Sequence, residues 1–186
     1  MPDLSQARRS VLEGLGSSDG AHGALSLLPP ISRLIFRGRI STIGRVAAAF
    51  GVEPAMEPCR AAVSGERAAL WLGPDEWLLL AKEGEAPAII RRLADALAPL
   101  SYSLVDVSHR QVGLKVTGED AQTILNAGCP LDLDRHAFPI GMCTRTLLQK
   151  TEIVLWRVAE AAFQLEVARS FAPYALRFLQ QAERDL

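Results

Sequence analysis

Hydrophobic and polar residues alternate on both sides of a short polar break near the middle of the chain. Valines flank Asp106 before the break, and apolar residues alternate with polar residues or glycine over 112–117 after it. A period of two is the pattern of a β-strand with one buried face. Apolar residues then recur at helical spacing over 120–127, and Gly128 ends that segment. The pattern predicts two strands around a bend at 108–110, followed by a helix.

The same order of elements occurs twice from residue 31 onward, which indicates an internal duplication. Each copy contains a strand, a helix, an extended segment, a hairpin and a final helix, with Trp71 and Trp156 on corresponding hairpin strands. We therefore expect an α+β fold, in which two pseudo-repeated strand-helix-hairpin-helix units form antiparallel sheet with segregated helices. The expected helices cover 42–50, 87–97, 120–127 and 173–183, and the expected hairpins join 68–72 to 77–81 and 153–158 to 163–168.

These elements divide the chain into three expected parts. Residues 14–30 are rich in Gly, Ser and Pro without a sustained period, so we expect residues 1–30 to form a flexible N-terminal arm. The first α+β unit is expected over 31–100 and the second over 101–186, the two packed as one domain.

The first hairpin is apolar on both of its faces. Residues 70–72 and 77–80 do not alternate as a strand solvated on one face should. Either both faces are covered within this chain, or one face lies in a subunit interface. The sequence leaves both explanations open.

Composition and charge narrow the possible partners. The formal net charge is -1 and the basic pairs are isolated, so no basic stripe could follow a phosphate backbone. No apolar run approaches the roughly twenty residues that span a bilayer, and the first fifteen residues lack a signal-peptide pattern. We therefore expect a cytoplasmic protein that binds neither nucleic acid nor membrane. The three cysteines, Cys59, Cys129 and Cys143, suit reduced thiols better than a disulfide framework.

Two clusters of reactive residue types were weighed as catalytic or metal sites. Asp106 and Ser108 share one strand face while His109 points to the other, and no GxSxG elbow accompanies them, so a polar bend is the preferred interpretation. The evenly spaced Cys129, His136 and Cys143 lack both a CxxC pair and a fourth ligand for zinc. The glycines are scattered and form neither a dinucleotide nor a triphosphate loop. We expect no catalytic, cofactor-binding or metal-binding residues in this chain.

Several motifs carry a family resemblance. The run Asp106-Val107-Ser108-His109, followed by Gly113, Gly118, Asp120-Ala121 and Leu125, resembles the strand-helix unit of the folate-binding aminomethyltransferase (T-protein) superfamily. Further motifs are similar to the gamma subunit of heterotetrameric sarcosine oxidase: Gly128-Cys129-Pro130-Leu131-Asp132-Leu133, Ala137-Phe138-Pro139, Thr144-Arg145-Thr146, Arg169-Ser170-Phe171-Ala172 and 73–79. These pieces span most of residues 30–186.

The resemblance implies a non-catalytic structural subunit of an oxidoreductase complex. Such a complex converts sarcosine, O2 and tetrahydrofolate to glycine, H2O2 and methylene-tetrahydrofolate, as part of sarcosine catabolism. The implied partners are the alpha, beta and delta subunits, and FAD, FMN and NAD are implied in those partners. Arginines suit bidentate contacts with partner carboxylates, and aromatic side chains supply contact area. The candidate interface residues are Trp71, Trp77, Arg145, Arg169 and Phe171.

Two alternative functions remain open. The first is a free-standing folate-binding one-carbon transfer protein of the T-protein type. The T-protein turn that carries an Asn and a nearby acidic pterin ligand corresponds here to Arg169-Ser170, which departs from that pattern. The second alternative is a homo-oligomeric domain with no small-molecule role. The final helix places Phe171, Tyr174 and Phe178 near one side, where aromatic residues at this spacing are expected to be core.

Overall fold

The computed structural model describes residue 12, residues 18–19 and residues 24–186. The other residues of the expected N-terminal arm lie outside the described part. The described end of that arm is not free of structure, because Ala24–Leu27 forms a strand, β2, that pairs with a central strand of a sheet. Leu25 on this strand is buried. The Gly- and Pro-rich composition of residues 14–30 obscured this short apolar strand.

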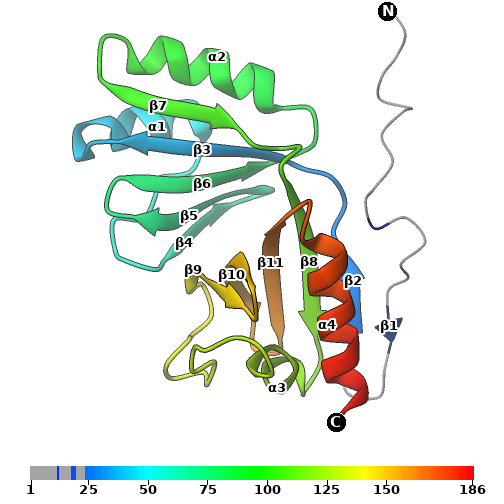
Figure 1. Cartoon of the computed structure of the whole chain (residues 1–186). Coiled ribbons are helices and arrows are strands. Elements are labelled where there is room, and N and C mark those ends of the chain that lie inside the picture. Colours follow the sequence, from blue (N-terminus) through cyan, green and yellow to red (C-terminus); the bar gives the residue numbers. More distant parts are fainter. Residues whose placement is uncertain (1–11, 13–17, 20–23) are drawn as a thin grey trace, which may run out of the picture.

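Eleven strands in the described residues form two sheets in which every pairing is antiparallel. The first sheet has the order β4-β5-β6-β3-β7 and the second has the order β1-β2-β8-β11-β10-β9 (Figure 1). The strands of the first sheet are β3 (Ser32–Gly38), β4 (Ala61–Ser64), β5 (Arg67–Gly73), β6 (Glu76–Ala81) and β7 (Tyr102–Asp106). Those of the second are β1 (Ser18–Asp19), β2 (Ala24–Leu27), β8 (Gln111–Thr117), β9 (Cys143–Leu148), β10 (Thr151–Ala159) and β11 (Ala162–Ala168).

The helices begin and end close to the positions that the sequence pattern predicts. The α-helices are α1 (Ile43–Phe50), preceded by the 3-10 turn η2 (Ile40–Thr42), α2 (Ala86–Leu97), α3 (Ala121–Asn126) and α4 (Ala172–Arg184). Helix α1 ends at Gly51, which adopts the left-handed conformation with φ +85° and so closes the last turn at little steric cost. Helices α2 and α4 both carry a proline in their first turn, where no backbone donor is lost.

The expected duplication is visible in the order of the strands. Strands β4, β5, β6 and β3 of the first sheet correspond to β9, β10, β11 and β8 of the second. The position beside β3 is filled by β7, and the position beside β8 is filled by β2, with β1 beyond it. The chain therefore exchanges one strand between the two halves, and the expected boundary between 100 and 101 does not separate the sheets. By strand pairing the crossing point lies in the bend at 107–110.

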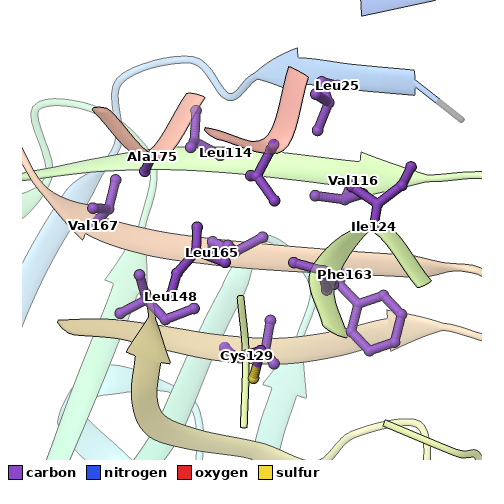
Figure 2. Packing of buried hydrophobic residues seen from close by; sticks show 14 of the residues in the cluster. Leu25, Leu114, Val116, Ile124, Cys129, Leu148, Phe163, Leu165, Val167 and Ala175 are labelled. Atoms are coloured by element: carbon purple, nitrogen blue, oxygen red, sulfur yellow. The ribbon is translucent and has the colours of Figure 1, made fainter. Parts of the chain in front are cut away.

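The core has three parts, because the two sheets face each other and the helices cover their outer faces (Figure 1). Helices α1 and α2 cover the first sheet, and α3 and α4 cover the second. Figure 2 shows Leu114, Phe163 and Leu165 of the second sheet packed in the core beneath α3 and α4. The inter-sheet core contains Ala68, Leu70, Leu78, Leu80, Val107, Cys143 and Val154.

This layering explains the doubly apolar hairpin. Alternate residues of β5 and β6 contribute to opposite cores: Leu70 and Leu78 pack between the sheets, whereas Ala69 and Leu79 pack under the helices. Of the two explanations that the sequence left open, coverage within the chain is the one that the structure contains. The apolar hairpin therefore gives no support to a subunit interface.

Candidate functional site

The bend between β7 and β8 uses its polar side chains to fasten itself to β3. The Asp106 carboxylate accepts hydrogen bonds from the Ser108 amide at 2.9 Å and from the Ser108 hydroxyl at 2.5 Å. The same hydroxyl oxygen accepts from the Arg33 amide at 2.9 Å, and the Val107 amide donates to the Arg33 carbonyl. The Ser108 hydroxyl is thus bonded within the bend, and the arrangement is the polar turn that the sequence favoured.

A buried ion pair lies between the two sheets next to this bend. The Arg33 Nε donates to the Glu166 carboxylate at 2.5 Å, and the two side chains are only 2% and 1% exposed. The other carboxylate oxygen of Glu166 accepts from the Gln164 side-chain amide at 3.0 Å, and Arg33 Nη1 donates to the Ile31 carbonyl at 3.2 Å. Arg33 Nη2 is buried with no hydrogen-bond partner among the described residues. The pair links β3 of one sheet to β11 of the other.

The buried pairing of Arg33 with Glu166 could not be predicted from the sequence pattern. Glu166 is buried against Arg33 and does not lie on the surface. Arg157 is also buried, and its guanidinium donates to backbone carbonyls at Leu133, Phe138 and Glu160. The alternation along 32–38 predicts that Arg33 lies on the strand face opposite the core under the helices. It does not indicate that a second sheet covers that face.

Two of the candidate interface residues, Trp71 and Arg145, lie where β5 and β9 meet. Trp71 is half-buried, and its carbonyl accepts from the Cys143 thiol at 3.7 Å. Arg145 is 39% exposed and forms an ion pair with Glu76 at the start of β6. Glu76 also lies 3.7 Å from Arg37 Nε. Arg145 therefore already has a carboxylate partner within this chain, although more than a third of its side chain stays accessible.

Trp77 is removed from the candidate interface by its burial. Its side chain is 0% exposed, it stacks with Phe36 at a ring-centroid distance of 6.0 Å, and its Nε1 donates to the Ala55 carbonyl at 2.9 Å. A tryptophan with its apolar body and its polar edge both satisfied in the core offers no surface to a partner. The assignment failed because both faces of β6 are covered.

The other two candidates, Arg169 and Phe171, lie together at the connection from β11 to α4. The Arg169 amide donates to the Arg110 carbonyl at 2.8 Å, which fixes this connection to the bend. Phe171 is 47% exposed and Tyr174 is 39% exposed, so these two aromatic residues are not core as their spacing indicated. Phe178, one turn further along α4, packs against the second-sheet core. The five candidates are thus divided into one buried residue and two separate surface groups.

The possible zinc ligands do not converge. Cys129 packs in the second-sheet core, Cys143 packs between the sheets, and His136 is exposed. Within the described ranges no group of three or more His, Cys, Asp or Glu side chains could hold a metal. The glycines with positive φ, at 51, 65, 84, 118 and 141, are dispersed over helix ends and turns, so they form no glycine-rich cradle for a flavin or nicotinamide dinucleotide within the described residues.

One polar depression of about 480 Å³ opens beside α3, lined in part by Asp134, Arg135 and Glu160. The amide of His136 donates to Asp134, and this bond holds the pKa of the Asp134 carboxyl below its ordinary value. Arg157 also lines the depression, and its guanidinium donates to the backbone carbonyls of Leu133, Phe138 and Glu160, so its charge stabilises the surrounding loops.

No helix in the described part of the chain is long and apolar enough to cross a membrane.

Comparison with known proteins gives consistent relatives. The chain matches, over residues 41–185, the family described as "Sarcosine oxidase, gamma subunit family". The sarcosine oxidase subunit gamma of Corynebacterium sp. (strain U-96) is 32% identical over 136 residues, which cover 73% of this chain and 65% of that protein. The subunit gamma of Arthrobacter sp. is 32% identical over 115 residues, covering 62% and 56%. The matches span less than two thirds of the length of these relatives.

The fold is similar to two solved structures. A chain of the heterotetrameric sarcosine oxidase from Corynebacterium sp. U-96, in complex with pyrrole 2-carboxylate, superposes with a TM-score of 0.88 and 28% identity, covering 97% of this chain and 96% of that one. The aminomethyltransferase T of the glycine cleavage system from Bartonella henselae superposes with a TM-score of 0.63 at 14% identity, over 86% of this chain and 46% of that one. The second likeness concerns the fold alone. By the family match over most of its length, this chain belongs to the sarcosine oxidase gamma subunit family.

Proposed function

We propose that this chain is a non-catalytic structural subunit of a heterotetrameric sarcosine oxidase. The observation that carries the proposal is the likeness to a chain of that oxidase over 97% of the residues at a TM-score of 0.88. The assembly would convert sarcosine, O2 and tetrahydrofolate to glycine, H2O2 and methylene-tetrahydrofolate, in the cytoplasm. Its other members would be the alpha, beta and delta subunits.

The chemistry of this chain supports a structural role. The Ser108 hydroxyl, the Arg33–Glu166 pair and the Arg157 guanidinium are all occupied in holding elements together. The dispersed glycines do not fit FAD, FMN or NAD, so these cofactors would be held by the partner subunits. Tetrahydrofolate would enter the reaction as a co-substrate of the complex, and the likeness to the aminomethyltransferase gives no support for a folate site here, because it concerns the fold alone.

The start of α4 is the part of the surface that we assign to partner contact. Phe171, the N-cap of α4, exposes 47% of its area and Tyr174, in the first turn, exposes 39%, with Arg169 just before them in the chain. Aromatic side chains and arginine are enriched at the centres of protein interfaces. Trp71 and Arg145 form a second, more polar contact area at the junction of β5 and β9.

The direct test is affinity purification of the tagged chain from its native cells grown on sarcosine. We expect the eluate to contain three further subunits, flavin absorbance and sarcosine-dependent peroxide formation. A colourless eluate that contains the tagged chain alone would refute the proposal. Light scattering of that eluate would then separate a monomer from a homo-oligomer.

The contact surface is tested with Phe171→Asp, a substitution that should not destabilise α4. Phe171 is the N-cap of α4, and aspartate is a preferred residue at that position and complements the helix dipole. The matched control is Ile40→Asp, which introduces the same charge at an apolar side chain that is 73% exposed. We expect Phe171→Asp to lower recovery of the partner subunits by roughly tenfold or more, as loss of an aromatic anchor does. Equal recovery with both variants would remove α4 from the interface while leaving the assembly itself in place.

A further inference from the structure

Two cysteines from opposite halves of the chain lie directly across a short antiparallel bridge. Arg60, just before β4, pairs with Met142, just before β9. The Ala61 amide donates to the Gly141 carbonyl at 2.8 Å, and the Cys143 amide donates to the Cys59 carbonyl at 2.9 Å. In this register Cys59 is the residue opposite Cys143.

The bridge sets a separation that suits a disulfide. Residues directly opposite each other in an antiparallel pair have Cα atoms about 4.5 to 5.5 Å apart. Cystines have Cα separations of about 4.4–6.8 Å, most often near 5.5–6 Å. The bond from the Cys143 amide to the Cys59 carbonyl brings the two backbones together, and Cys59 is, after burial, among the groups that raise the pKa of the Cys143 thiol, so the two side chains lie near each other.

The backbone at Cys59 is a second, independent observation. Cys59 has φ +59°, in the left-handed region, and follows Pro58 in a turn. A turn with proline at its second position and positive φ at its third is normally completed by glycine or asparagine. A cysteine there holds a conformation that its Cβ disfavours, and such outliers cluster at functional positions.

The two thiols have different surroundings. Cys143 is fully buried between the sheets, and burial raises the pKa of its thiol to about 12. Cys59 is partly exposed, and the guanidinium of the next residue, Arg60, is paired with Glu57 at 3.1 Å. An oxidant from solution thus reaches Cys59 first, and Cys143 is the protected thiol that reacts with the oxidised partner.

We infer that Cys59 and Cys143 form a reversible disulfide that covalently joins the two sheets under oxidation by hydrogen peroxide. The Cys59 sulfur attacks one peroxide oxygen, the O–O bond breaks, and the Cys59 proton leaves with the other oxygen, so a sulfenic acid and one water result. The Cys143 sulfur then attacks the Cys59 sulfur, the S–O bond breaks, and the Cys143 proton leaves with the hydroxyl as water. In total two thiols are oxidised, one peroxide is reduced and two waters form.

Trypsin separates the three cysteines cleanly, which makes the test direct. Cys59, Cys129 and Cys143 fall in the fragments 46–60, 116–135 and 136–145. The full chain is treated with hydrogen peroxide, remaining thiols are alkylated in denaturant, and the digest is analysed by mass spectrometry without reduction. We expect fragments 46–60 and 136–145 to be joined with loss of two hydrogens, and to separate on reduction.

Three comparisons decide the outcome. Cys129→Ala should keep the link and Cys59→Ser should abolish it. In a mixture of isotopically heavy and light chains, linked fragments that are wholly heavy or wholly light support an intrachain bond, and mixed pairs overturn it. A Cys59 fragment recovered only as sulfinic or sulfonic acid, with Cys143 alkylated, also overturns the inference. The thermal unfolding midpoint of the oxidised chain should lie on the order of 5 °C above that of the peroxide-treated Cys59→Ser variant, and it should return to its starting value on reduction. An unchanged midpoint would refute the joining of the two sheets.

Discussion

The buried ion pair between β3 and β11 gives the sharpest prediction about stability. Glu166→Gln keeps the size of the side chain but removes the charge that faces the Arg33 guanidinium. Among the described residues, the one other hydrogen bond of this guanidinium goes from Nη1 to the Ile31 carbonyl. With both side chains at most 2% exposed, water does not replace the lost charge. Removing one partner of a buried pair costs about 3–5 kcal/mol, because the other charge stays buried and uncompensated.

For a chain of this size, that loss lowers the unfolding midpoint by roughly 6 to 20 °C. We expect the same loss in urea unfolding of the full chain, followed by tryptophan fluorescence. The double variant Arg33→Met/Glu166→Leu should recover most of the lost stability, because replacing a whole buried pair by apolar side chains is often neutral. The control is Asp75→Asn, which breaks an ion pair with Arg37 in which both side chains are more than half exposed, and it should cost less than about 1 kcal/mol.

Two results would refute this reasoning. One is that Glu166→Gln lowers the free energy of unfolding no more than Asp75→Asn does. The Glu166 carboxylate would then not be desolvated, although its side chain is only 1% exposed. If the double variant were as unstable as the sum of the two single variants, Arg33 and Glu166 would not act as a pair.

Two further predictions concern glycine packing and a thiol. Gly38→Ala should destabilise the chain by about 1–3 kcal/mol in urea unfolding. The added Cβ would lie 2.6 Å from the buried Phe36 ring and 2.7 Å from the Thr42 hydroxyl. The control is Gly44→Ala in α1, where the added Cβ has no atom within 4 Å, and it should be neutral or stabilising by up to about 1 kcal/mol. Because burial raises the pKa of the Cys143 thiol to about 12, the folded state keeps this proton where the unfolded state loses it, so stability of the reduced chain should fall as pH rises from about 9 to 12. Urea midpoints of Cys143→Ala should fall less than those of the parent chain between pH 8 and pH 10.5, and parallel curves would contradict the assignment.

The sequence predicted the elements and their repetition well, because these depend on local pattern. Gly51 and Pro87 define helix ends through their own backbone preferences, and the positions of Trp71 and Trp156 in the two hairpins revealed the duplication. Strand exchange was not predictable in this way. The pattern of Ala24–Leu27 or of Tyr102–Asp106 specifies a strand but not which sheet edge it joins.

The candidate site was predicted less well for a related reason. Period-two alternation separates the faces of a strand, but it does not say what covers each face. Trp77 was assigned to a surface and is buried, whereas Tyr174 was assigned to the core and is exposed. Arg33 was overlooked because an arginine that points away from one core is ordinarily solvated. Only the second sheet, which packs on that face, makes Glu166 its partner.

The exchange of β2 and β7 has a consequence for how the chain acquires its structure during synthesis. Strand β2 is synthesised before all of the first sheet, yet its partner β8 follows that sheet, so β2 cannot pair with β8 until β3 to β7 have been produced. Contacts so distant in sequence are closed late and slow the search for the native state. Conversely, β7 completes the first sheet and is followed directly in the chain by β8, which is a central strand of the second sheet. We therefore regard the two halves as a single cooperative folding unit, which a cut between residues 100 and 101 would leave with one sheet lacking β7 and the other lacking β2.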